Sequence, residues 1–395
     1  MKLSRCLLLV ISLSFSAGTN CPAAVRVEQL INDLSADSFS AREEATRLFL
    51  EQDPSVIPLV RNLLQTTDDA EVKQRARRIL MVLEERDLDA RLQAFLRDTD
   101  EKQGVSLPGW KQFREVAGNS QEARDLFVEM QRAESKLLLL YDTSPDKVSD
   151  ALAQQMYEQT LAMTTSNGIR SRNMPKAGSV ATYWFLAGEP ELKLGGETAN
   201  GIVRLYHTAG VSSQLTSPGT MRDLFVRWIL RESEPMVMMQ NLNYATQLNL
   251  PEAGKLAERV VTSTLQPSLR VGGLGMLVKT KKKAALPILE KALADEGVTY
   301  QFFPNGNRGE RPKEPYKIQF RDLALVQMMS LCEQKPADFG LSVPLPTEMN
   351  MFNVEYQKLI IATDEDRETL HKKWRAWWDK HKAEHTPTAA NPAKS

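Results

Sequence analysis

The 395-residue chain carries 50 Lys plus Arg against 50 Asp plus Glu, so its formal net charge is zero. This balance gives no overall positive field to attract a phosphate backbone, and we exclude a nucleic-acid partner. A hydrophobic content of 42% and a charged content of 25% are ordinary for a folded domain. We therefore expect a folded protein whose function does not depend on net charge.

Residues 1–24 have the profile of a signal peptide. Lys2 and Arg5 precede an apolar run over residues 6–17, which is too short to span a bilayer. Small and polar residues follow, and we expect cleavage near Ala23 or Ala24. The mature chain is then exported, to the periplasm or out of the cell.

The cysteines exclude a disulfide framework. Cys6 lies within the signal peptide, which leaves Cys332 and, if it survives cleavage, Cys21. Lipid attachment at Cys21 is disfavoured, because Asn20 stands where a small residue is expected. Cys332 lies in a predicted apolar helix, and we expect a buried, inert thiol there.

Two helix pairs are predicted between residues 27 and 83. Their first helices carry four apolar residues each at helical spacing: Val27, Leu30, Ile31 and Leu34, then Val56, Leu59, Val60 and Leu63. Their second helices repeat 31 residues apart, as Arg42, Ala45 and Leu48, then Lys73, Ala76 and Ile79. We expect Asp37 and Asp68 to cap these second helices. The register indicates a two-helix repeat.

The same pattern returns between residues 268 and 324. Ser268-Leu269-Arg270 with Gly273 and Met276 echoes the segment that begins at Ser40. Pro287 echoes Pro58 in the first turn of a helix, where a proline's missing N–H costs nothing. Arg321 and Ala324 echo Lys73 and Ala76, after an insertion of about twenty residues.

These repeats resemble HEAT-type repeats. Together with the signal peptide, three further segments resemble secreted HEAT-like proteins of planctomycete-type bacteria: Arg321–Leu325, Lys335–Gly340 and Lys373–Trp378. The resemblance covers residues 26–85 and 268–378. It implies a helical repeat fold and an exported location, and the group has no assigned activity.

The remaining chain is mostly helical by pattern. A charged connector over 84–101 ends at a Gly- and Pro-containing break over 104–110. Helical periodicity marks residues 121–141, 146–163, 220–232, 236–249 and 252–265. Residues 164–201 lack a clear period and are expected to be irregular, either as a divergent repeat or as a small insert. Terminal residues 386–395 are expected to be disordered.

We interpret the chain as all-α, an α-solenoid of HEAT-like antiparallel helix pairs with this irregular middle segment and one inserted loop. The repeat regions are 25–101, 102–267 and 268–385. Near the end, Leu370, Trp374, Trp377 and Trp378 form one apolar helix face behind a cap at Thr363 and Asp366. We expect this face to seal the open end of the stack.

The insertion at 295–317 is the principal candidate for partner binding, because repeat proteins place insertions on one face as loops. A short strand is expected at 298–303, with a hairpin turn at Asn305-Gly306. The candidate contact residues here are Tyr300, Phe302, Phe303, Asn305 and Arg308. A merely decorative loop is the alternative.

A second candidate surface is the lysine group of Lys279 and Lys281–Lys283. Lys281 and Lys282 could bind an acidic partner or an anionic membrane surface. The simpler reading is a solvated turn that complements the C-terminus of a helix. Gly272-Gly273-Leu274-Gly275 follows no strand, so we read it as helix packing rather than a nucleotide loop.

No catalytic, cofactor or metal constellation is found. The four histidines include an isolated His207 and the pair His381 and His385, which lacks the accompanying carboxylate of a zinc-protease helix. Adventitious metal binding by that pair stays open. We expect a non-catalytic scaffold with an unidentified protein partner.

Two alternatives remain. An enzyme or small-ligand binder would use residues 164–210 as a pocket, with polar groups from Asn167, Arg170, Arg172 and His207. A peripheral envelope protein would use the lysine group.

Overall fold

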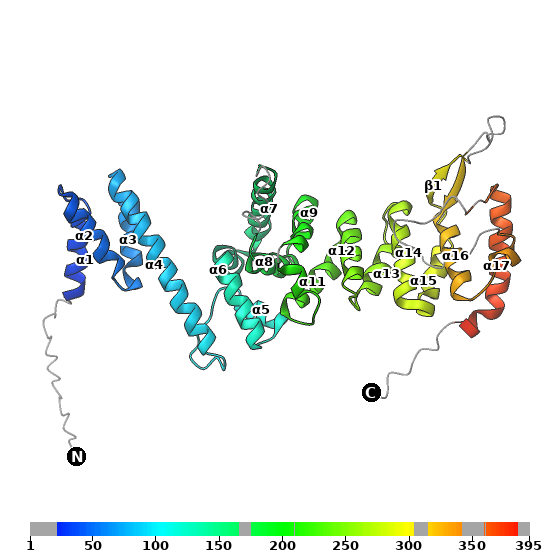
Figure 1. Cartoon of the computed structure of the whole chain (residues 1–395), viewed down its shortest axis with the longest axis horizontal. Coiled ribbons are helices and arrows are strands. Elements are labelled where there is room, and N and C mark those ends of the chain that lie inside the picture. The colour runs from blue at the N-terminus through cyan, green and yellow to red at the C-terminus, as the bar shows by residue number, and fades with distance from the viewer. Residues whose placement is uncertain are drawn as a thin grey trace, which may run out of the picture. The chain divides into compact units, whose positions relative to one another are not determined.

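The computed structural model describes residues 22–165, 175–208, 210–303, 315–341, 359 and 361–385. These residues are predominantly helical and contain a single two-stranded sheet, which confirms the all-α class (Figure 1). Among them, no helix has both the length and the hydropathy that crossing a bilayer requires. The chain divides into two compact units between Leu107 and Pro108.

The first unit has four helices: α1 (Pro22–Asp33), α2 (Phe39–Leu50), α3 (Ile57–Thr66) and α4 (Ala70–Arg97). α1 packs on α2, and α3 packs on α4. The buried core includes Val27, Leu30 and Leu34, together with the small residues Ala45 and Ala76. The repeated alanines therefore lie where the helices approach each other, as predicted.

Two details of this prediction were wrong. Leu59 is 48% exposed, and Ile57 takes its place in the core beside Val56 and Val60. The buried face of α3 is thus rotated by part of a turn from the predicted stripe. The caps are displaced by one residue: Ser38 and Asp69 occupy the N-cap positions, and the Asp69 carboxylate accepts from the backbone N–H groups of Glu71 and Val72.

The second unit begins with α5 (Trp110–Ala117), α6 (Gln121–Thr143), α7 (Val148–Thr165), α8 (Ala177–Ala187) and α9 (Gly196–Arg204). It continues through α10 (Val211–Gln214), α11 (Thr220–Arg231), α12 (Pro235–Gln247), α13 (Ala253–Thr262), α14 (Pro267–Lys281) and α15 (Leu286–Ala292). The strands β1 (Val298–Phe302) and β2 (Tyr316–Gln319) precede α16 (Phe320–Leu331) and α17 (Asp364–His385).

The segment expected to be irregular contains two helices. Residues 166–174 lie outside the described residues, but α8 and α9 occupy much of 175–204. Ten of the eleven residues of α8 are buried, so its sequence shows no polar face and no amphipathic period. At its start Gly178 lies against α6, where an added Cβ would stand 2.3 Å from the Glu129 carbonyl oxygen.

Arginine side chains recur at the ends of neighbouring helices, where they bind main-chain carbonyls. Arg86 of α4 donates to Leu50 and Gln52 after α2. Arg231 donates to Ala187, Pro190 and Leu192 after α8, and Arg259 of α13 donates to Leu230, Arg231 and Glu232 after α11. The last carbonyls of a helix have no partner within the helix, and a cation there also complements the helix dipole.

We call these arginines the carbonyl clamps. Arg42 and Arg270 extend the set, donating to Ala36 and Asp37 and to Val261 respectively. Burial lowers the pKa of both Arg231 and Arg259 from the ordinary arginine value. Both side chains are partly buried, whereas Arg86 is exposed.

The predicted glycine packing is confirmed at α14. A Cβ on Gly273 would lie 2.8 Å from Cγ1 of Val260 in α13, so only glycine allows this approach. Cys332 is buried at the end of α16, and burial raises the pKa of its thiol to about 11. This buried environment agrees with the inert thiol expected from the sequence.

The insertion forms an antiparallel pair of strands, as predicted, and the predicted turn at Asn305-Gly306 lies outside the described residues. Phe302 pairs with Tyr316, and Tyr300 with Ile318, with a bulge between Val298 and Tyr300. The two strands are thus joined by residues 303–315. Residues 304–314 lie outside the described residues.

Helix α17 carries the tryptophan face. Trp374 and Trp378 are buried with Leu370, whereas Trp377 is only partly covered. Phe339 meets the Trp374 ring at a centroid distance of 5.3 Å. The predicted cap is confirmed, because the Thr363 hydroxyl accepts from the Asp366 N–H and donates to its carboxylate. The tail over 386–395 lies outside the described residues.

Candidate interaction site

The strand pair presents one apolar face and one polar face. Cross-strand partners share a face, so Tyr300, Phe302, Tyr316 and Ile318 lie on one side and Gln301 and Lys317 on the other. Ile318 is buried at the base, while Tyr300 is 41% exposed. The Phe302 ring lies 5.7 Å from Tyr300 and 5.9 Å from Tyr316, centroid to centroid. An aromatic row thus runs from the core toward solvent.

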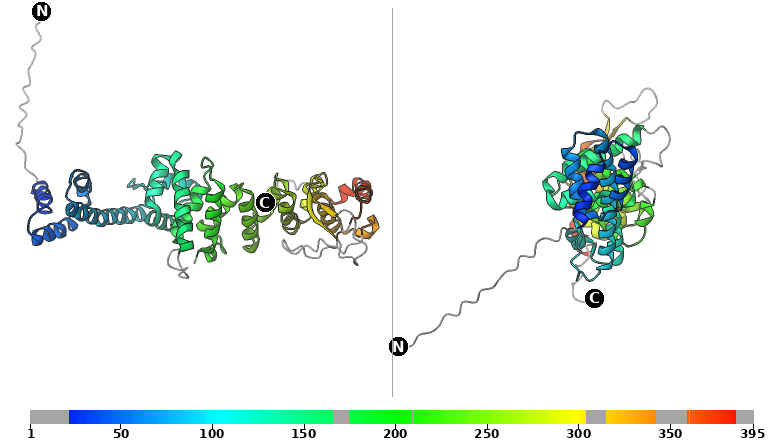
Figure 2. Two further views of the ribbon diagram at one scale, coloured as in Figure 1. Left: turned by 90° about the horizontal axis from the view of Figure 1, so that it is seen from above. Right: turned by 90° about the vertical axis from the view of Figure 1, so that its left-hand side faces the viewer.

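We define the hairpin surface by the residues of this strand pair whose apolar side chains are wholly or partly exposed: Val298, Tyr300, Phe302, Phe303 and Tyr316. Phe303 is 52% exposed and Val298 is 37% exposed. In Figures 1 and 2 the strands, drawn in yellow, lie with the helices α14 to α17. Figure 1 shows them rising beyond the ends of these helices.

The base of the hairpin is fixed on α14. The Asp295 carboxylate pairs with Arg270 and accepts from the Gly297 N–H at 3.0 Å. Gly297 itself sits against Pro267, where an added Cβ would lie 2.4 Å from the proline Cγ. Arg270 also stacks over the Phe320 ring, 4.2 Å from its centroid. The first strand therefore leaves the helical layer at a defined position.

A buried polar network fixes the second strand. The Asp322 carboxylate, 1% exposed, accepts from Nε of Arg367 at 3.0 Å and from Nε2 of His371 at 3.2 Å. It also accepts from the Gln319 N–H in a capping box at the start of α16. Arg367 reaches on to the Lys317 carbonyl at 2.6 Å. β2, α16 and α17 are thereby joined through one carboxylate.

The sequence did not predict this network, although Arg321-Asp322 lies in one of the three segments that resemble secreted HEAT-like proteins. Asp322 lies 45 residues from Arg367 and 49 from His371 along the chain, and no local pattern links it to them. One signal was present. An aspartate directly before the apolar residues Leu323 to Val326 requires a partner when the helix is buried.

The two predicted candidate regions are not brought together. Gly297, at the base of the hairpin, touches the first residue of α14, whereas Lys281 is its last. At 1.5 Å per residue the length of α14 separates them by roughly 20 Å. Lys281 is paired with Glu258, and Lys282 is exposed in the short helix that follows. Asn305 and Arg308 lie outside the described residues.

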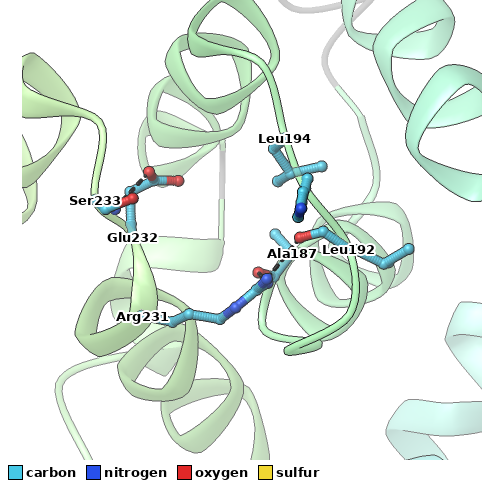
Figure 3. Close-up of a pocket in the computed structure, with 7 residues that line it drawn as sticks. Ala187, Leu192, Leu194, Arg231, Glu232 and Ser233 are labelled. Atoms are coloured by element: carbon cyan, nitrogen blue, oxygen red, sulfur yellow. Dashed lines mark hydrogen bonds between the residues drawn. The ribbon is translucent and has the colours of Figure 1, made fainter.

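An open hollow of about 270 Å³ lies near the predicted alternative pocket (Figure 3). Its lining comes from the segment after α8 and the end of α11: Ala187, Leu192, Lys193, Leu194, Arg231, Glu232 and Ser233. Arg231 already donates hydrogen bonds to the carbonyls of Ala187 and Leu192. The Glu232 carboxylate accepts from the N–H groups of Ser233 and Glu234. The principal charges of the wall are thus used within the protein.

His207 is not part of this hollow. It is exposed and its Nε2 lies 2.9 Å from the Tyr244 hydroxyl, beside the stacked rings of Tyr206 and Tyr244. Asn167, Arg170 and Arg172 lie outside the described residues. Within the described part of the chain, no three His, Cys, Asp or Glu side chains are grouped as a metal site.

The chain matches no family model, no curated protein and no solved structure. The resemblance to secreted HEAT-like proteins therefore stays a prediction. The candidate site is defined by its geometry, an aromatic hairpin held on a helical base.

Proposed function

We propose that this protein is a non-catalytic, extracytoplasmic scaffold built as a HEAT-like α-solenoid, and that it binds a protein partner through the hairpin surface. The observation that carries the proposal is the contrast within the hairpin. Its base is tied by buried charged groups, while its aromatic side chains extend into solvent. Exposed aromatic residues on a rigid support are typical of binding surfaces.

Two observations support the solenoid. The helix pairs repeat in sequence, and the carbonyl clamps join the end of one helix to a later helix in both units. Stacked repeats contact chiefly their neighbours, so such a ladder of local ties is what the architecture needs. The export of the chain rests on the signal-peptide profile of residues 1–24.

The rigidity of the hairpin supports its role in binding. A partner that docks on a fixed surface does not bear the entropy of ordering a flexible loop. The strand pair is held from both sides, by Asp295 on the α14 side and by Asp322 on the α17 side. Tyr300 and Phe302 are therefore presented in a prepared position.

The test is a crosslinking pull-down from native envelope extract. We would compare the full chain with a Tyr300→Ala, Phe302→Ala variant, and with a Gln301→Ala control on the opposite face of the strand. A protein recovered with the full chain and the control, and reduced tenfold or more with the aromatic variant, supports the proposal. Equal recovery with all three chains, or recovery of nothing, overturns it.

The alternative of a small-ligand binder or enzyme would use the hollow of Figure 3. A metabolite screen against the full chain tests this alternative, with Lys193→Ala as the matched variant. Lys193 lines the hollow and is not one of the carbonyl clamps. The envelope-associated alternative predicts salt-dependent binding to anionic vesicles that is lost on neutralising Lys282 and Lys283.

A further inference from the structure

The last turns of α17 carry two histidines on one face. His381 and His385 are four residues apart, and on a helix such residues have Cβ atoms about 5–6 Å apart. Spacing alone does not make a site, because each imidazole must also present a free nitrogen. The structure shows how both rings are held.

The ring of His381 has a fixed orientation. Its Nδ1 lies 2.8 Å from the Trp377 carbonyl, and since a carbonyl only accepts, Nδ1 carries the proton. Nε2 is then the nitrogen with the lone pair. The ring stacks on the Trp377 indole at 4.6 Å between centroids. An imidazole whose other nitrogen donates to a backbone carbonyl is the usual arrangement of a metal ligand.

His385 packs beside the same indoles, with its centroid 5.5 Å from Trp377 and 6.5 Å from Trp378. Its Nδ1 is buried and has no hydrogen-bond partner among the described residues. Nε2, the other ring nitrogen, is not among the buried atoms that lack a partner, and it is the nitrogen that the proposal uses. Lys382, between the two histidines, binds Glu290 of α15 at 2.7 Å, so its charge is compensated away from them.

We propose that His381 and His385 form a two-donor site for a divalent transition metal that prefers imidazole, namely Cu²⁺, Ni²⁺ or Zn²⁺. The metal would bridge one turn at the end of α17, with its other positions open to water. Binding to the folded helix alone stabilises it by mass action. This site is independent of the proposed scaffold function.

The experiment titrates the full chain with Cu²⁺ alone at about pH 7.5 and follows tryptophan fluorescence, because Trp377 and Trp378 adjoin the site and Cu²⁺ quenches nearby indoles. We expect saturable quenching at one equivalent. His381→Ala and His385→Ala should each weaken the midpoint about tenfold or more. His207→Ala, which removes an exposed histidine that contacts Tyr244, should leave it unchanged.

A second measurement does not depend on the variants. Ni²⁺ should raise the Tm of the unmodified chain at about pH 7.5 and not at about pH 5, where protons compete for imidazole nitrogens. Quenching without saturation, or an unchanged midpoint in the His381→Ala, His385→Ala double variant, means an adventitious ion only and overturns the proposal. An unchanged Tm at both pH values overturns it too.

Discussion

Asp322 shows how much can depend on one buried side chain. Its carboxylate accepts hydrogen bonds from an arginine, a histidine and a backbone N–H at the N-terminus of α16, and it has almost no contact with water. A buried charge is tolerated only when its partners neutralise it and fill its hydrogen-bonding positions. The proposed partner-binding surface therefore depends on a residue that does not lie on it.

Replacing Asp322 by Ala should destabilise the second unit by about 3–5 kcal/mol, because Arg367 and His371 would stay buried without their carboxylate. The free energy of unfolding in urea, followed by circular dichroism, measures this. Asp364→Ala is the matched control. It removes another carboxylate bound to Arg367, but one that is 81% exposed, and we expect it to cost under about 1 kcal/mol. Equal losses of unfolding free energy in the two variants would contradict the larger contribution expected of the buried network.

At the scale of the helix, the approach of α8 to α6 depends on a missing side chain. Gly178 allows the two backbones to meet at a distance that excludes a Cβ. Glycine inside a helix ordinarily costs about 1 kcal/mol relative to alanine. Here the close packing of α8 on α6 stabilises the protein by more than the lower helix propensity of glycine destabilises it.

Gly178→Ala should therefore destabilise the protein by roughly 1–3 kcal/mol, despite the gain in helix propensity. Gly196→Ala, at the start of α9, is the comparison, since its Cβ would stand 3.4 Å from Glu234, an ordinary contact. We expect Gly196→Ala to be neutral or stabilising. Thermal unfolding of both variants gives the answer, and a stabilised Gly178→Ala would show that α8 can shift.

The elements could be predicted from sequence to the extent that one face of each was polar. α11, α12 and α13 alternate buried and exposed residues and appear where their periodicity placed them. α8 was missed because burial on all sides erased its period. The strands of the insertion were found, but their register depends on Ile318 being buried, which no local pattern reveals.

In the candidate site, the same limit holds. The exposed aromatic residues could be named because an insertion of unusual composition interrupts a repeat. Their supports could not, since Asp295 with Arg270 and Asp322 with Arg367 are pairs formed only after the helices stack. The ring orientations of His381 and His385 likewise follow from packing against Trp377.

At the scale of the whole chain, the division between Leu107 and Pro108 should be accessible to proteases. Residues 99–104 before it are exposed, although the Asp98 carboxylate binds the N–H groups of Gln103 and Val105. Limited trypsin digestion should cut first after Lys102 and leave two resistant fragments, identified by mass. The Lys102→Gln variant should resist this first cut. An initial cut inside α4 or α14 would contradict the division.

The carbonyl clamps have a consequence for how such a protein can change over time. A main-chain carbonyl is present in every residue type, so an arginine that binds one places no demand on the side chain it meets. The helix ends at Leu50, Ala187 and Leu230 can therefore accept substitutions while the hydrogen bond remains. A chain built in this way can keep its helix stacking while its sequence diverges, provided that each arginine stays.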